Sequence, residues 1–226
     1  MNRCKSMLDD CERHFYEPTK GHGLPHDPLN AIVAPRPIGW VSTRGLNEVL
    51  NLAPYSFFNA FNYRPPIIGF SSIGEKDSLR NVKETGEFVW NLVTRDLAER
   101  MNSTSASVPY GVSEFELAQL TPIASRLVSV PRVGESPVNF ECKLTEVIQL
   151  KDHRQTLVQT WLVFGEVVGV HIRKDLLKNG MFDTFGARII VRAGSPSVYA
   201  EIAPESRFDM QQPQWWRRFL SASGWR

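Results

Sequence analysis

The sequence predicts a mainly β protein, folded as a barrel and decorated by short helices. Two observations indicate this class. About seven segments are rich in β-branched and aromatic residues and are bounded by turn residues, whereas the stretches with helical signals are short and few. The chain has 226 residues, a length at which β-barrel domains commonly form a single unit.

The composition is that of an ordinary globular protein. The formal net charge is only +2, which does not predict binding to nucleic acid or to a membrane surface. Three cysteines cannot all pair within one chain, and the polar first residues do not resemble a signal peptide, so we expect reduced thiols and a cytoplasmic protein. Cys4, Cys11 and His14 lack zinc-finger spacing, so no metal site is expected.

The first strands are expected to form a hairpin. Residues 1–28 read as a polar arm that ends in glycines and prolines. Residues 31–43 are the first strand region, 44–48 a turn, and 49–53 a returning strand.

The strand within residues 35–43, Pro-Arg-Pro-Ile-Gly-Trp-Val-Ser-Thr, combines a rigid backbone with varied side chains. Its prolines lack N–H donors, so the strand should start at a sheet edge or in a loop. Gly39 permits close approach to the backbone, and Trp40 offers a flat ring. Ser42 and Thr43 add hydroxyls. Such a strand suits a planar ligand rich in heteroatoms, and the alternative is an edge strand with a buried tryptophan.

Residues 54–61 crowd four aromatic side chains around two polar ones, Ser56 and Asn59. Core packing explains the phenylalanines. It explains the interleaved polar groups less well, because buried polar groups need hydrogen-bond partners. A ligand would supply those partners.

A short strand at residues 66–72 is followed by a helix with clear end signals. Asp77 or Ser78 is a good N-cap, residues 79–85 are helical, and Gly86 is a natural C-cap.

The start of this helix has the residues of an anion site. A helix N-terminus carries free N–H groups and partial positive charge. Lys76 and Arg80 flank it, and Ser71, Ser72 and Ser78 supply hydroxyls. The alternative is a capped surface helix with solvated basic residues.

The second half of the chain is dominated by a long hairpin, at residues 139–150 and 155–172. A tail from residue 204 carries Trp215, Trp216, Phe219 and Trp225 among arginines, and we expect it to pack on the body or on a second subunit. The other expected elements are a strand at 88–93, a helix at 95–102, a capping box at 113–116, a helical turn at 174–179, a last strand at 187–192 and a loop at 193–198.

Several common sites are not predicted. The chain lacks G-x-G-x-x-G, G-x-x-x-x-G-K-[ST] and G-x-S-x-G. A Rossmann or P-loop nucleotide site and a serine-hydrolase elbow are therefore not expected.

Taken in order, three stretches resemble the flavin reductase-like family of FMN-binding split β-barrels. They are residues 35–43, residues 51–59 (Asn-Leu-Ala-Pro-Tyr-Ser-Phe-Phe-Asn) and residues 76–81 (Lys-Asp-Ser-Leu-Arg-Asn). Residues 165–172 are similar to that family's late barrel strand. The resemblance covers most of the chain and implies a domain at residues 29–203, between the arm at 1–28 and the tail at 204–226.

The resemblance implies a homodimer that binds FMN at the subunit interface. The first two stretches would line the isoalloxazine, and the Lys-Asp-Ser loop would hold the phosphate. Where the family often has Arg-x-Gly-Gly, this chain has Arg192-Ala193-Gly194-Ser195, so substrate preference does not carry over. The expected cofactor-binding residues are Trp40, Val41, Ser42, Thr43, Tyr55, Ser56, Phe57, Phe58, Asn59, Ser71, Ser72, Lys76, Asp77, Ser78 and Arg80.

The function that the resemblance implies is an FMN-dependent oxidoreductase. The leading hypothesis is an NAD(P)H:flavin reductase that passes electrons to free flavin, oxygen or a partner oxygenase. His171 is a candidate for proton handling or nicotinamide contact, with a structural role as the alternative. The rival functions are an oxidase or oxygenase with its own small substrate, and a non-catalytic FMN-binding module.

Overall fold

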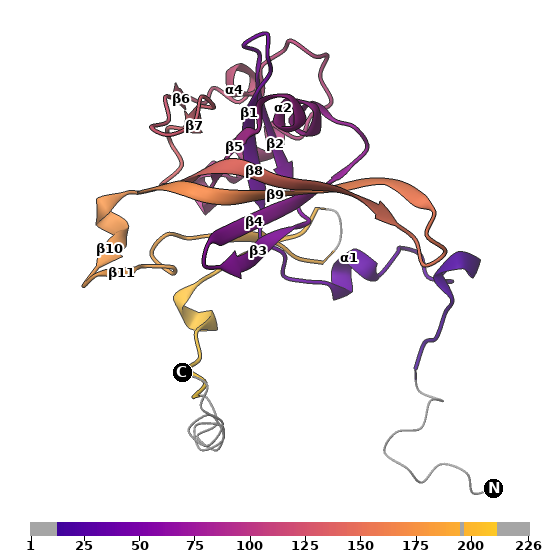
Figure 1. Cartoon of the computed structure of the whole chain (residues 1–226). Helices are drawn as coiled ribbons and strands as arrows, with labels where there is room; N and C mark the ends of the chain where they lie inside the picture. The colour runs from indigo at the N-terminus through magenta and orange to yellow at the C-terminus, as the bar shows by residue number, and fades with distance from the viewer. Residues whose placement is uncertain (1–12, 195–196, 212–226) are drawn as a thin grey trace, which may run out of the picture.

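A seven-stranded antiparallel sheet organises the chain (Figure 1), in the order β2-β1-β5-β8-β9-β4-β3. The structure is a computed structural model, and it describes residues 13–194 and 197–211. The strands are β1 (Gly39–Arg44), β2 (Leu50–Tyr55), β3 (Phe58–Tyr63), β4 (Pro66–Ile73), β5 (Glu87–Asn91), β8 (Val138–Lys151) and β9 (Leu157–Ile172).

The longest element is the β8–β9 hairpin, which crosses the middle of Figure 1 between α2 and the strands β3 and β4. Its strands have 14 and 16 residues, as the β-rich sequence predicted. The pairing register shifts at three places along the hairpin. Such irregularities bend a strand and increase its twist, so they let this sheet curve.

The sheet curls until strands that are not neighbours meet. The ring centroids of Tyr55 on β2 and Phe70 on β4 lie 4.6 Å apart, although four strands separate β2 from β4 in the sheet order. Both rings belong to a core cluster that includes Val41, Phe88 and Val163. Gly165 makes this core possible, because a Cβ there would lie 2.3 Å from the ring of Phe88.

Alternation along β1 divides the core into two parts. Successive side chains of a strand point to opposite faces. Trp40 packs with Met101 and Phe115, whereas Val41 packs with Leu79 and Phe88. Strand β1 is therefore covered on both faces, by α3 and α4 on one side and by the barrel interior and α2 on the other.

Helix α2 (Asp77–Thr85) is the predicted helix after β4, and Gly86 ends it in the left-handed conformation with φ 72°. Leu79 and Val82 are fully buried against the sheet. The expected N-cap was wrong by one residue. Lys76 is the N-cap and makes no side-chain capping bond, and Asp77 in the first turn pairs with Arg80 instead.

The remaining helices are short. The predicted helix at 95–102 is a 3₁₀ turn, η3 (Arg95–Leu97), continued by α3 (Ala98–Ser103). Ser113 is the N-cap of α4 (Glu114–Leu117) without a side-chain bond, so the capping box was wrong. The others are η2 (Pro18–Lys20), α1 (Leu29–Ile32), η4 (Lys174–Leu176) and η5 (Pro204–Ser206). None of the helices in the described ranges has the length and apolarity to cross a membrane.

The first strand is shorter and more central than the sequence suggested. Residues 29–32 form α1, and β1 starts only at Gly39. The prolines were expected either at a sheet edge or in a loop. They lie in the loop that precedes β1. An edge position for the strand was wrong, because β1 pairs with both β2 and β5. Every residue of β1 itself has an N–H, so the prolines that precede it do not prevent central pairing.

Strand β3 was missed, and the expected last strand lies outside the main sheet. Most residues of β3 are exposed, so they show no alternation of apolar and polar side chains, and pairing with β4 forms the strand. At the other end, β12 (Ile190–Arg192) pairs with β13 (Tyr199–Glu201), which was also not predicted. Two further small pairs are β6 (Pro122–Ile123) with β7 (Arg132–Val133), and β10 (Leu177–Lys178) with β11 (Met181–Phe182).

Some expectations fall on residues that the structure does not describe. They are Cys4, Cys11, the tail tryptophans Trp215, Trp216 and Trp225, and Ser195. Cys142 is a free, buried thiol, and no cluster of metal-ligating side chains occurs in the described part of the chain.

Candidate functional site

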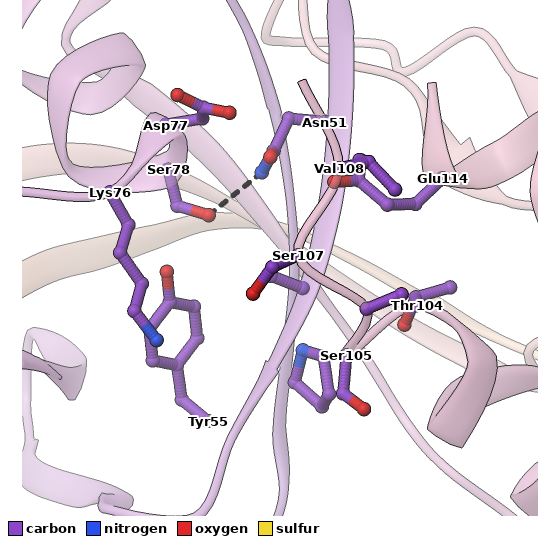
Figure 2. Close-up of a pocket in the computed structure, with 13 residues that line it drawn as sticks. Asn51, Tyr55, Lys76, Asp77, Ser78, Thr104, Ser105, Ser107, Val108 and Glu114 are labelled. Atoms are coloured by element: carbon purple, nitrogen blue, oxygen red, sulfur yellow. Dashed lines mark hydrogen bonds between the residues drawn. The ribbon is translucent and has the colours of Figure 1, made fainter. Parts of the chain in front are cut away.

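A cavity of about 300 Å³ opens at the N-terminal end of α2 (Figure 2). We call it the α2 cavity. Four elements line it: β2, the start of α2, the loop that follows α3 and the start of α4. Its lining residues are Asn51, Ala53, Pro54, Tyr55, Lys76, Asp77, Ser78, Thr104, Ser105, Ala106, Ser107, Val108 and Glu114.

A buried amide network fixes the start of α2 against the sheet. The Asn51 side chain donates to Ser78 Oγ at 2.8 Å, as Figure 2 shows, and to Thr43 Oγ1 at 3.3 Å. Asn81 also donates to Thr43 Oγ1, at 3.1 Å. All four side chains are buried. The helix N-terminus therefore has one position relative to β1 and β2.

Lys76 is the free cation of the cavity. Its side chain extends from the start of α2 past Tyr55 in Figure 2, and it forms no ion pair with a residue of the described ranges. The neighbouring Asp77 has a partner of its own, Arg80. A lysine at a helix N-terminus without a carboxylate partner is suited to an anionic ligand.

Tyr55 brings a buried hydroxyl to the same cavity. Its oxygen makes no hydrogen bond of ordinary geometry within the described part of the chain, although the hydroxyls of Ser78 and Ser72 lie near enough to oppose the rise of its pKa. Burial raises the pKa of the phenol to about 12, so the group stays protonated and can donate at neutral pH. A buried hydroxyl without a partner is costly, and a ligand oxygen in the cavity would satisfy it.

The loop at residues 104–112, which we call the cavity loop, is tied to the body at its start. Trp40 Nε1 donates to Thr104 Oγ1 at 3.0 Å. This bond satisfies the buried indole N–H, and it anchors the residues that line the cavity from the side opposite α2.

The cavity loop is tied again near its end by Tyr110. The Tyr110 hydroxyl donates to Asn47 Oδ1 at 2.9 Å, and the Arg80 guanidinium lies 4.0 Å from the centroid of the Tyr110 ring. Gly45 leaves the room for this contact, because a Cβ there would lie 2.6 Å from the Tyr110 oxygen. Arg80 is thus engaged by Asp77 and Tyr110 and does not line the cavity.

A second hollow, of about 150 Å³, adjoins the α2 cavity. We call it the Arg192 hollow. It shares Pro54, Tyr55 and Ser105 with the α2 cavity, and adds Ile38, Ser56, Met101, Asn102, Arg192 and Tyr199. Arg192 donates to the Tyr199 hydroxyl at 2.9 Å. The two spaces together suit an elongated ligand with an anionic end at α2 and a partly apolar end at Arg192.

The structure brings together part of the predicted site. Tyr55, Lys76, Asp77 and Ser78 line the α2 cavity, and Ser56 lines the Arg192 hollow.

Other predicted residues lie elsewhere. Trp40, Val41, Ser42 and Thr43 are buried inside the protein, with Ser42 donating to Pro131 O at 2.7 Å. Their position follows from the coverage of β1 on both faces.

The other predicted cofactor-binding residues also lie outside both spaces. Phe58 stacks on Trp90 at 5.5 Å, and with Asn59 it lines a separate apolar cavity. Phe57 is partly exposed. Ser72 is buried and donates to Gly74 O at 2.9 Å, and Ser71 is half-buried beside it on β4.

His171 also lies outside both spaces. It is hydrogen-bonded to the buried carboxylate of Glu141, which accepts N–H bonds from Arg126 and Leu127 as well. Burial alone would raise the pKa of Glu141, but these partners stabilise its charge and the pKa is lowered. The contacts are those of a structural pair that joins β8 and β9 to the 126–127 segment.

Sequence reasoning missed the residues that the cavity loop supplies. None of Thr104, Ser105 and Ser107 was predicted as a site residue, and Glu114 appeared only as part of a helix start. Asn51 belongs to the second stretch, residues 51–59, but no role was predicted for it. The run Ser-Thr-Ser-Ala-Ser at 103–107 was the available signal, since hydroxyl-rich loops suit anionic ligands.

The sequence matches the family described as flavin reductase like domain over residues 33–190. The chain belongs to this family. Two relatives are uncharacterized proteins from Aquifex aeolicus, 39% identical over 66% of this chain and 76% of the relative, and from Halalkalibacterium halodurans, 38% identical over 73% and 80%. The predicted family is confirmed.

Solved structures confirm the split-barrel fold. Nitrilotriacetate monooxygenase component B from Bacillus cereus has a TM-score of 0.76 and 32% identity, covering 92% of this chain and 100% of that one. The 2-nitrobenzoate 2-nitroreductase of Pseudomonas fluorescens has a TM-score of 0.72 and 29% identity, over 82% and 88%. Flavoredoxin of Desulfovibrio vulgaris, at 21% identity and a TM-score of 0.70 over 84% and 95%, shares the fold.

We predict that Tyr110 holds the cavity loop in place. In Tyr110→Ala, backbone amides of residues 104–109 should exchange with deuterium roughly 5- to 30-fold faster, because a cation–π contact and a hydrogen bond together contribute about 1–2 kcal/mol. Tyr110→Phe should show a smaller increase, since it loses only the hydroxyl.

Hydrogen–deuterium exchange read by mass spectrometry checks this. Tyr16→Ala is the matched control, because Tyr16 is a half-buried tyrosine that lines neither space and does not contact the cavity loop. Unchanged exchange of the loop in Tyr110→Ala would show that the Tyr110 contacts do not restrain it.

Proposed function

We propose that this protein is an FMN-dependent oxidoreductase that takes a hydride from NADH or NADPH and passes the electrons to an acceptor. The observation that carries the proposal is the pair of adjoining spaces, one lined by the free Lys76 ammonium and the other by Arg192, which share Pro54, Tyr55 and Ser105. Membership of the flavin reductase like domain family supports a flavin as the occupant.

The α2 cavity would hold the FMN phosphate. The backbone N–H groups of the first turn of α2 lack a side-chain cap, and Lys76 beside them has no ion-pair partner in the described ranges. Ser78 and the buried hydroxyl of Tyr55 add neutral donors. Partial charges, one full positive charge and hydroxyls converge on one point, as a phosphate group requires.

The Arg192 hollow would receive the flavin ring. Ile38 and Met101 give it apolar walls, and Arg192 with Tyr199 gives it a polar rim. Bound FMN supplies the hydride chemistry, and the protein supplies position and electrostatics. The chain needs no acid or base for hydride transfer itself, which depends on alignment of donor and ring.

The electron acceptor we favour is a partner oxygenase. The 32% identical protein from Bacillus cereus is one component of a monooxygenase, and a component that delivers reduced flavin fits the proposed reaction. The free, buried thiol of Cys142 fits a cytoplasmic setting.

We further propose that the working form is a homodimer. Strand β3 ends the sheet and leaves large apolar side chains exposed, with Tyr63 82%, Phe61 56% and Phe57 39% accessible. An end strand with exposed aromatic residues is a typical surface for association.

A second candidate is an enzyme that acts on its own small substrate with bound flavin. The relative from Pseudomonas fluorescens, named as a nitroreductase and 29% identical, favours it. Neither candidate requires His171, which would remain a structural residue.

The proposed reaction predicts that NADH or NADPH bleaches the flavin absorbance under anaerobic conditions. Mixing the FMN-loaded protein with each nucleotide in a stopped-flow spectrometer checks it. Fast bleaching supports the reductase. If neither nucleotide reduces the flavin within minutes, the reductase is wrong, and the protein is a substrate-specific enzyme or a non-catalytic binder.

The dimer predicts that dilution releases the cofactor. Analytical ultracentrifugation with detection at the flavin absorbance would show FMN travelling with the dimer and free FMN appearing as monomers form. A monomer that carries FMN at full stoichiometry would rule the prediction out.

The phosphate assignment predicts that Lys76→Ala weakens FMN binding by about 1.5–3 kcal/mol, or roughly ten- to a hundredfold, because a charge-assisted contact is lost. Riboflavin, which lacks the phosphate, should bind almost as before. High salt should weaken FMN more than riboflavin, since screening acts on the charged contact.

Quenching of flavin fluorescence measures both affinities. Lys83→Ala is the matched control, because Lys83 lies on the same helix but pairs with Glu75 and does not line the cavity. Equal losses for the two flavins would assign Lys76 to the fold rather than to the phosphate.

A further inference from the structure

Glu114 places a buried carboxyl group in the wall of the α2 cavity. The residue begins α4 and is 5% exposed. Its Oε2 accepts the Leu52 N–H at 2.9 Å, which satisfies a donor on the outer edge of the end strand β2. No lysine, arginine or histidine of the described ranges forms an ion pair with it.

The charges around this carboxyl are unbalanced. From α2 it faces Lys76 and Asp77, and from β2 it faces Tyr55, which is neutral. The cavity loop contributes hydroxyls, and Glu116 on α4 itself does not line the cavity. Burial raises the pKa of Glu114, with the charge of Asp77 adding to the shift and the Leu52 N–H opposing it. One free ammonium thus faces two carboxyl groups.

A phosphate monoester entering this cavity would add a charge of about −1.5 to −2 at neutral pH. An ionised Glu114 would then repel the ligand at low dielectric, where like charges interact strongly. A proton on the second oxygen, Oε1, removes this repulsion and leaves Oε2 free to accept from Leu52. It also converts an anion into a hydrogen-bond donor.

Building on the proposed FMN site, we propose that Glu114 takes up a proton from solvent when the flavin phosphate enters the α2 cavity. Phosphate binding and proton binding are then coupled at this residue. Glu114 makes the affinity for phosphorylated flavin rise as pH falls, through a window that extends upward from the pKa of the ligand-free carboxyl. The phosphate's own second ionisation, near pH 6, acts in the opposite direction, because the monoanion binds Lys76 less strongly.

Because these two titrations overlap, the proton itself must be counted. The experiment is isothermal titration calorimetry of FMN and of riboflavin at pH 7.0, in buffers that differ in ionisation enthalpy. With wild-type protein we expect FMN to bind with net uptake of up to about half a proton, the most that a shift of about one pKa unit can give at this pH. Riboflavin, which brings no charge, should bind with uptake near zero.

The variant Glu114→Gln keeps an oxygen for the Leu52 N–H but cannot titrate. We expect its uptake with FMN to vanish or to reverse in sign, and its affinity for FMN at pH 8 to increase by up to about tenfold, which corresponds to about one unit of pKa. Glu116→Gln on the same helix is the matched control and should behave as wild type.

Several outcomes would overturn the inference. They are equal proton uptake for FMN and riboflavin with wild-type protein, unchanged uptake in Glu114→Gln, and an equal loss of affinity for both flavins in that variant. The last result would make Glu114 an anionic acceptor for the flavin's hydroxyl chain. The comparison of two flavins on wild-type protein needs no variant, so it stands even if Glu114→Gln does not fold. Failure of both flavins to bind wild-type protein would overturn the proposed function itself.

Discussion

The coverage of strand β1 on both edges and both faces is the constraint on which the site depends. β1 pairs with β2 and β5, and its alternating side chains enter two separate core clusters. Through Trp40 it holds the start of the cavity loop, and through Thr43 it holds the amide network under α2. The two walls of the α2 cavity are thus attached to opposite faces of one strand, and their separation is set by the sheet.

Charged groups of both signs line the α2 cavity and act on any ligand that binds there. A helix N-terminus and Lys76 attract an anion, whereas Asp77 and Glu114 oppose it. The structure reduces this opposition at Asp77 by pairing it with Arg80, outside the cavity. The Glu114 carboxyl accepts the backbone N–H of Leu52, and no cation of the described ranges forms an ion pair with it. Protonation of Glu114 is then the simplest way to remove its negative charge when an anion binds, and it requires no change in packing.

Sequence predicted the parts of this site whose signals are local. Gly86 marked the end of the helix. Lys76, Ser78 and Tyr55, which were predicted to bind the cofactor, line the α2 cavity, and their binding role stays a prediction. The opposite wall was not predicted, because it comes from tertiary contacts such as that of Trp40 with Thr104, 64 residues apart in the chain. Trp40 was expected at a sheet edge, and its indole lies in the core because two later strands flank β1. Strand β3 was missed because its exposed face carries no alternation.

The residues of the cavity loop have two different roles, because some anchor the loop and the others line the cavity. Thr104 and Tyr110 hold the loop to the body, whereas Ser105, Ala106, Ser107 and Val108 between them contribute side chains to the cavity wall. Substitutions within that interval change the ligand surface without touching the core clusters. Natural variation can therefore explore new ligands there while the barrel keeps its stability, so the interval is where we would look for the differences that separate one member of this family from another.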